Sequence, residues 1–221
     1  MKNLFIICFF ALSACTNSSS ESEKGKDASM NANATINSDI NCLKTAELNS
    51  AMHKLWEDHI TWTRNVICCL VDNLPGSDQA VQRLLKNQDD IGNAIKPYYG
   101  DDAGKKLTDL LHEHITTAAE VVKAAKANNT KALDTANKKW YDNADQISDF
   151  LNKANPENWK LEDVKMMMHD HLKLTTDEAV ARIKKDYNAD AAAYDKVHKE
   201  ILEMADALSN GIVRQFPDKF K

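Results

Sequence analysis

Residues Leu55–Leu70 read LWEDHITWTRNVICCL, and the histidine in this stretch has two later counterparts in similar surroundings. An acidic residue, a histidine and a branched aliphatic residue recur in three places: DHIT at 58–61, EHIT at 113–116 and DHLK at 170–173. Each histidine lies in a long segment whose apolar residues recur every three or four positions, which indicates an amphipathic helix. The sequence therefore predicts three helices that each carry one inward imidazole.

The same periodicity predicts six helices and an all-α fold. The few Gly and Pro residues, 6 and 4 in 221, mostly lie between the periodic segments and mark helix ends. The predicted helices run from Asp39 or Thr45 to about Asn73, from Ser77 to a position before Pro97, from Asp101 up to Asn128, from Thr130 to a position before Pro156, from Asn158 to about Tyr187, and from there to the QFPDKF tail at 215–220. Short connections make consecutive helices antiparallel. We therefore expect an antiparallel helical bundle of four long helices, the first, third, fifth and sixth, plus two further helices.

Composition limits the classes of function. With 43% hydrophobic and 28% charged residues, the chain can bury one sizeable core. Its formal net charge of -5 provides no basic surface for nucleic acid, so we expect no nucleic-acid partner. Composition does not indicate the oligomeric state.

The N-terminus has the pattern of a processing signal. Lys2 precedes an apolar run, Leu4–Leu12, that is too short to span a bilayer, and LSAC follows at 12–15. This pattern resembles a bacterial lipoprotein signal peptide, which implies that residues 1–14 are removed and that Cys15 carries acyl chains such as palmitate. Several acyl chains would anchor the protein to a membrane. The alternative is an ordinary cleaved secretory signal.

Residues 15–40 are rich in Ser and Asn and are predicted to form a lipidated flexible tether, with the helical domain at 41–221. Thr16 after the lipidated cysteine resembles the outer-membrane sorting case, and the nearby Glu21 and Glu23 resemble surface-export signals. We therefore expect a cell-envelope protein anchored in the outer membrane, on either its periplasmic or its surface face. Cys42, Cys68 and Cys69 are placed too far apart, or diverge too much on a helix, to form a disulfide.

The three histidines lie at nearly the same height along parallel helices. His59 is 14 residues after Thr45, and His114 and His171 are each 13 residues after the predicted starts of their helices. Three neutral imidazoles at one level can bind a first-row transition metal such as Zn, Cu or Fe. Candidates for a fourth ligand come from the neighbouring helices: His198, Asp195, Asp142 and Asp145. The acids that precede the histidines, Asp58, Glu113 and Asp170, could each orient an imidazole of a neighbouring helix.

Two other interpretations remain open. In the first, the histidines are core residues with local hydrogen-bond partners, in a non-enzymatic envelope module that binds a small ligand or a protein. An enzyme that uses a metal-bound water is less favoured, because no base with suitable spacing is recognisable. In MMMHDH at 166–171, the mixture of thioether and imidazole groups suits copper, but consecutive methionines on a helix point in different directions, which favours core packing.

Several motifs resemble a family of small all-helical bacterial proteins with no established activity. They occur in this order over about residues 50–210: LWEDHITWTR, RLLKNQDDI, KPYYG, HEHI, KKWYDNAD, MMHDHLKLTTDEA and KKDYNADAAAYD. Some members carry the names acetylglutamate kinase or glycosyltransferase, but this chain has no Gly-rich phosphate loop after a strand and no strand pattern. The resemblance implies one helical domain that contains the three histidine segments.

Overall fold

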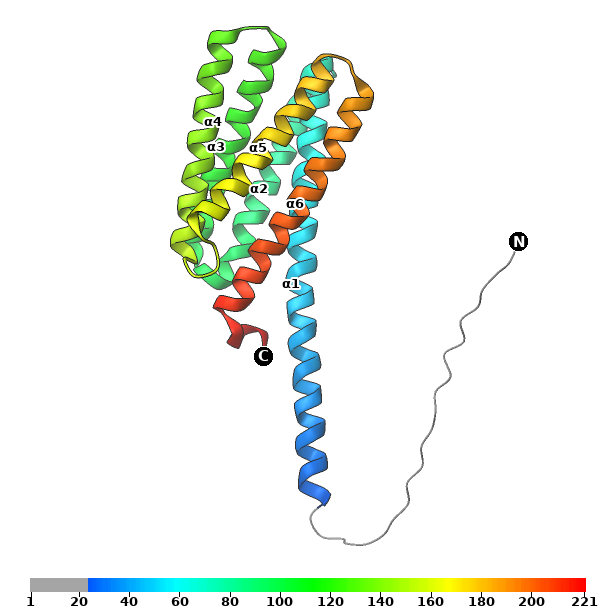
Figure 1. The fold of residues 1–221 in the computed structure, drawn as a ribbon, viewed down its shortest axis with the longest axis vertical. Helices are drawn as coiled ribbons and strands as arrows, with labels where there is room; N and C mark the ends of the chain where they lie inside the picture. The colour runs from blue at the N-terminus through cyan, green and yellow to red at the C-terminus, as the bar shows by residue number, and fades with distance from the viewer. Residues whose placement is uncertain (1–23) are drawn as a thin grey trace, which may run out of the picture. The chain divides into compact units, whose positions relative to one another are not determined.

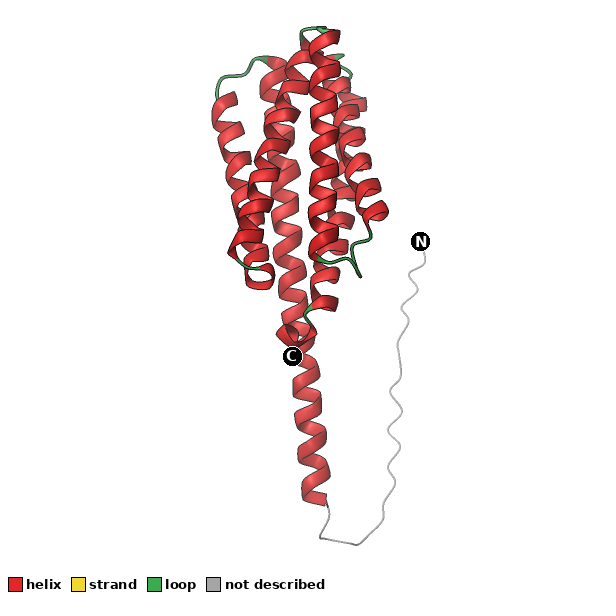
Figure 2. Cartoon of the chain, turned by 90° about the vertical axis from the view of Figure 1, so that its left-hand side faces the viewer, coloured by secondary structure: helices red, strands yellow, loops and turns green. Residues whose placement is uncertain are grey.

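In the computed structural model, the backbone is described for residues 24–221 and the side chains from Cys42 onward. The described chain is helical and contains no strand, so the all-α prediction is confirmed. Its elements are α1 (Lys24–Asp72), α2 (Ser77–Tyr99), α3 (Asp101–Lys126), α4 (Thr130–Ala154), α5 (Leu161–Ile183), α6 (Tyr187–Gln215) and a short 3-10 helix, η1 (Pro217–Phe220). Within residues 40–221 consecutive helices run in opposite directions, as expected for short connections (Figures 1 and 2).

Contacts divide the chain into two units, which meet between Asp39 and Ile40. The predicted signal peptide, residues 1–14, and the predicted lipidation site, Cys15, lie outside the described residues. Helix α1 begins at Lys24, so residues 24–40 of the predicted tether are helical rather than irregular. Extending an existing helix costs far less than nucleating a new one, which is why a polar segment can continue a long amphipathic helix.

All six expected helices are present, and the two further helices, α2 and α4, are similar in length to α5. Helix α2 has 23 residues, as many as α5, and α4 has 25. Helix α2 continues through Pro97 to Tyr99 instead of stopping before the proline. A Cβ atom on Gly92 would lie 2.7 Å from the carbonyl oxygen of Gly104, so these two glycines allow α2 and α3 to pack backbone to backbone.

Helix starts differ from the sequence expectation by one to a few residues. The N-caps are Gly76, Gly100 and Lys160 for α2, α3 and α5, where Ser77, Asp101 and Asn158 were expected. Gly76 and Gly100 have φ values of 88° and 86°, a region that favours glycine and lets the chain reverse between helices. The predicted helices themselves are present at each of these positions.

The bundle core is formed by the apolar faces of all six helices. Its most deeply buried aliphatic side chains come from different helices: Ile60, Leu84, Ile91, Ile147, Val164, Leu172, Val197, Ile201 and Ile212. Trp159, in the connection between α4 and α5, closes one end by packing on Gly211 and donating a hydrogen bond to the carbonyl of Ala207 (3.2 Å). None of the helices in the described part of the chain is both long and apolar enough to cross a membrane.

Candidate functional site: the buried histidine centre

The three histidines predicted to face inward do so. His59 on α1, His114 on α3 and His171 on α5 are 3%, 3% and 5% exposed. All three line one cavity of about 30 Å³, whose other walls are aliphatic, thioether and tryptophan side chains. The equal heights inferred from the sequence therefore correspond to a shared buried position.

His59 and His171 are in ring contact. Their ring centroids lie 5.7 Å apart with an interplanar angle of 41°. Two imidazoles that bind one tetrahedral ion, with nitrogen–metal distances near 2.1 Å, have ring centres about 5 Å apart. The spacing of this pair is therefore close to that of two ligands of a single ion.

His171 is oriented by a carboxylate on α6. Its Nδ1 lies 2.9 Å from Oε2 of Glu200, so Nδ1 carries the proton and donates to the carboxylate. Nε2 of His171 makes no hydrogen bond within the described residues, which leaves its lone pair available. This arrangement, with one ring nitrogen bonded to a carboxylate and the other unbonded, is the one commonly found in metal-bound histidines.

His59 is held less tightly. Its Nδ1 contacts Nε2 of Gln88 at 3.3 Å. The same amide nitrogen lies 2.8 Å from the carbonyl of Leu84 and 3.0 Å from Oδ1 of Asn87. An amide has only two hydrogens, so the longest of these three contacts, to His59, is the weakest.

His114 uses both of its ring nitrogens in bonds to the protein. Trp140 Nε1 donates to His114 Nε2 at 3.1 Å. Asn143 donates its amide hydrogen to the carbonyl of Leu110, so its Oδ1 accepts from His114 Nδ1 at 2.8 Å. His114 is thus a neutral, fully hydrogen-bonded core residue, which is the alternative that the sequence left open.

Burial keeps two of these histidines neutral. It lowers the pKa of His114 from its ordinary 6.5 to about 3, helped by repulsion from His171. Burial also lowers the pKa of His59 well below 6.5, and repulsion from His171 and His114 adds to this effect. Neutral imidazole is the form that binds metal ions.

The carboxylates predicted to orient the imidazoles do not reach them. Asp58 pairs with Lys54 on its own helix at 2.7 Å, and Glu113 and Asp170 are exposed. A residue beside a buried histidine in sequence is turned by about 100° around the helix. That turn exposes Glu113 and Asp170, and it brings Asp58 to 3.8 Å from Arg83 on α2 rather than to an imidazole. The orienting carboxylate is Glu200, from a different helix.

None of the predicted fourth ligands faces the cavity. Asp142 pairs with Lys138, Asp145 with His169 and Lys165, and His198 with Glu57, while Asp195 is exposed. Within the part of the chain that the structure describes, no group of three or more His, Cys, Asp or Glu side chains is arranged to hold a metal ion. The bond from Trp140 to His114 is the evident obstacle, because it occupies a nitrogen that a third ligand would need.

Methionine thioethers share the cavity with the histidines. Met52 on α1, Met168 on α5 and Met204 on α6 all line it. Within the MMMHDH stretch, only Met168 faces this cavity; Met166 is 59% exposed. The divergence of consecutive methionines predicted from helix geometry is confirmed.

No protein-family model, curated protein or solved structure matches this chain. The resemblance to a family of small helical bacterial proteins therefore stays a prediction.

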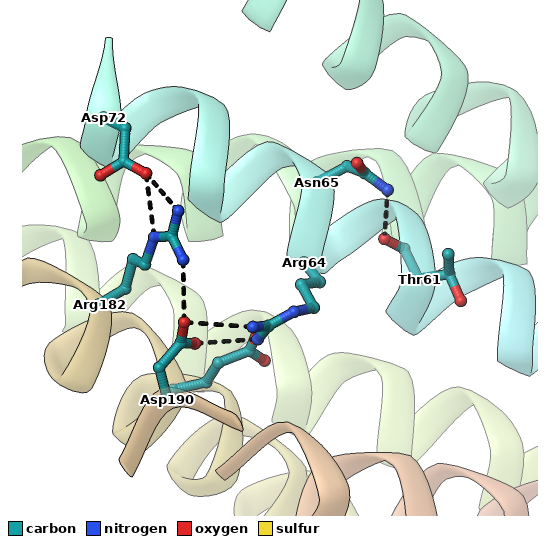
Figure 3. A network of polar contacts seen from close by, with 7 residues as sticks. Thr61, Arg64, Asn65, Asp72, Arg182 and Asp190 are labelled. Atoms are coloured by element: carbon teal, nitrogen blue, oxygen red, sulfur yellow. Dashed lines mark hydrogen bonds and ion pairs between the residues drawn. The ribbon is translucent and has the colours of Figure 1, made fainter. Parts of the chain in front are cut away.

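A buried network of charges, which sequence reasoning did not identify, lies next to the histidine centre. Arg64 bonds Glu178 at 2.6 Å and Asp190 at 2.9 Å, and Arg182 bonds Asp190 at 3.1 Å (Figure 3). Arg182 also bonds Asp72, near the end of α1. The network thereby connects α1, α5 and α6. One signal was present in the sequence: Glu178 lies on the otherwise apolar stripe that includes His171.

Burial also changes the protonation of this network. It raises the pKa of Glu178 from its ordinary 4.5 to about 7, against the opposing attraction of Arg64. Arg64 stays charged, because its bonds to Asp190 and Glu178 raise its pKa despite partial burial. The network therefore contains one carboxyl group that can take up a proton near neutral pH.

Proposed function

We propose that this chain is a lipid-anchored protein of the cell envelope that binds one transition metal ion, Zn, Cu or Fe, between His59 and His171. The observation that carries the proposal is the 5.7 Å spacing of the two rings at the wall of one cavity. The bond from His171 Nδ1 to Glu200 supports it, because this bond leaves Nε2 free to ligate.

The size of the cavity favours an ion over an organic ligand at this position. A water molecule occupies about 30 Å³ in the liquid, and the cavity has about 30 Å³ of internal space. A metal ion, or one or two water molecules, fits such a volume. An organic metabolite does not.

The lining of the cavity favours copper(I) among the three metals. Soft thioether ligands select Cu(I), and Met52, Met168 and Met204 border the same space as the two imidazoles. Zinc prefers imidazole, thiolate or carboxylate ligands, and none of the three cysteines Cys42, Cys68 and Cys69 lines this cavity.

Metal titration of chelator-stripped protein tests the proposal. We expect His59→Ala and His171→Ala each to weaken binding more than about 100-fold, since each removes a ligand. Glu200→Gln should weaken binding by about 10- to 100-fold through the orientation of His171. His114→Ala should have a smaller effect, because its nitrogens are bonded to Trp140 and Asn143.

Parallel titrations with Cu(I), Zn(II) and Fe(II) identify the metal, and His198→Ala is the matched control, since His198 pairs with Glu57 away from the cavity. Stoichiometric binding that survives both His59→Ala and His171→Ala would contradict the proposed ligands.

If no metal binds, a second candidate is preferred: a non-enzymatic envelope module whose histidines are structural and which binds a small ligand or a protein. The complete hydrogen bonding of His114 favours this second candidate.

The proposed anchor makes a separate prediction. Cys15→Ala should move the protein from the membrane to the soluble fraction and abolish acyl labelling, because the LSAC motif ends at the proposed lipidated residue. Cys42→Ala, which changes an exposed cysteine of the bundle unit, is the control and should leave both unchanged. Cell fractionation with labelled fatty acid measures the result, and wild-type protein found only in soluble fractions would contradict the anchor.

A further inference from the structure

A second cavity, larger than the histidine cavity, lies among α1, α2, α3, α4 and α5. Its volume is about 100 Å³. Its walls are mainly aliphatic and come from these five helices, and they include Ile67, Leu84, Ile115, Leu133, Ala179 and Val180. No charged side chain lines it among the described residues, so the cavity disfavours an ionised ligand.

One buried hydroxyl in this cavity has no partner. Thr175 is 5% exposed, and its Oγ1 makes no hydrogen bond within the described residues. Two other threonines that line the cavity behave differently: Thr63 donates to the carbonyl of His59, and Thr176 donates to the carbonyl of Leu172, each at 2.8 Å. A buried hydroxyl without a partner is costly. The Oγ1 atom has almost no surface exposed to the cavity, so a ligand with one polar group would satisfy it after the Thr175 side chain rotates about its Cα–Cβ bond.

One side of the cavity lies near the surface of the bundle. Several of its lining residues are half-buried, among them Ala118, Ala119, Asn137 and Thr176. Figure 1 shows α5 running obliquely to α3 and α4, so that it diverges from them towards the turn that joins those two helices. The half-buried lining residues place one side of the cavity close to the surface of the bundle.

We propose that this cavity binds a small uncharged apolar molecule with one polar group, about the size of phenol, whose polar group hydrogen-bonds to Thr175. An apolar cavity of about 150 Å³ in a protein core can hold benzene, so this cavity of about 100 Å³ admits a ligand of that size only after its side chains move outward. This site is distinct from the proposed metal site and does not depend on it.

Trp140 separates the two sites. Its ring lines the second cavity, while its Nε1 donates to His114, which lines the first. Occupation of the second cavity therefore changes the environment of this indole. Intrinsic tryptophan fluorescence offers a readout that needs no labelling.

The test compares phenol with benzene, titrated into the full chain in the presence of a metal chelator and followed by calorimetry and fluorescence. We expect saturable binding of both, with phenol about 2- to 10-fold tighter, because only phenol satisfies Thr175. Thr175→Val should remove this preference. Thr176→Val is the matched control and should keep it, since that hydroxyl is already bonded to Leu172.

Variants that fill the cavity provide a second test of the proposal. Ala179→Leu and the half-buried Ala118→Leu each add a branched side chain to its wall and should weaken phenol binding at least 10-fold. If Ala179→Leu fails to fold, Ala118→Leu still decides the result. Equal affinity of the wild type for phenol and benzene, or unchanged phenol binding in Ala118→Leu, would overturn the proposal. Because the chelator removes metal throughout, a failure of the metal proposal cannot produce either outcome.

Discussion

Asp190→Ala is expected to lower the free energy of unfolding by about 3 to 5 kcal/mol, the usual cost of removing one member of a buried ion pair. Asp190 is 1% exposed and accepts hydrogen bonds from Arg64 and Arg182. Without it, two largely buried guanidinium groups lose their shared acceptor. Arg64 would keep only Glu178, whose ionisation burial already disfavours.

Urea denaturation at neutral pH measures this loss. Asp142→Ala is the control: Asp142 is exposed and pairs with Lys138 one turn earlier, so its replacement should change stability by less than about 1 kcal/mol. Adding Arg64→Met to Asp190→Ala should restore part of the loss, because it removes a buried charge that has lost its partner. A loss below about 1 kcal/mol for Asp190→Ala would show that the network contributes little.

The stability of the metal-free protein is expected to fall as the pH is lowered from 6.5 to 4.5. In the unfolded chain, His59 and His114 take up protons near their ordinary pKa of 6.5, whereas in the folded protein burial keeps them neutral, in His114 down to about pH 3. Each such histidine lowers stability by about 1.4 kcal/mol per pH unit over the range where only the unfolded form is protonated.

Protonation of Glu178 has the opposite effect, because it stabilises the folded protein as the pH falls. Its pKa is about 7 in the folded protein and ordinarily 4.5, so between these values the folded form holds the extra proton and gains stability as the pH falls. The two histidines lower the free energy of unfolding and the one glutamate raises it. The net loss is about 1.4 kcal/mol per pH unit, or about 3 kcal/mol between pH 6.5 and 4.5.

Urea titrations at several pH values test both contributions. His59→Gln should flatten the slope, since it removes one titrating group, and Glu178→Gln should steepen it, since it removes the opposing one. A chelator in every sample excludes pH effects that arise from metal binding. If the free energy of unfolding of the wild type increases as the pH falls, or if neither variant changes its dependence on pH, the proposed protonation states are contradicted.

Most of the fold could be predicted from the sequence, because helix periodicity is a local property. The spacing of Leu48, Met52, Leu55 and His59 indicates the buried face of α1 without knowledge of any other helix. The ends of the helices could be predicted less well. Helix α2 continues through Pro97 to Tyr99, although a proline usually ends or kinks a helix, and no local pattern indicates the close approach of Gly92 to Gly104 on α3.

The candidate site, like the fold, could be predicted only in part. That His59, His114 and His171 face inward follows from their position on apolar stripes, and their common height follows from counting residues. Their partners could not be predicted. Glu200, Trp140 and Asn143 come from helices whose rotation and offset are set by packing. Asp58, which is adjacent to His59 in sequence, pairs with Lys54 instead of an imidazole, and Glu113 and Asp170 are exposed.

The sequence by itself determined that the chain forms antiparallel helices with three buried imidazoles at one level, because a helix repeats every 3.6 residues and short connections reverse its direction. Only the tertiary structure decided which nitrogens of the three imidazoles are hydrogen-bonded, that Arg64 and Arg182 share Asp190, and that Thr175 has a buried hydroxyl without a partner. These features depend on how side chains from different helices meet. A rotation of one helix by a single residue, about 100°, would exchange every one of those contacts while leaving the helices themselves intact.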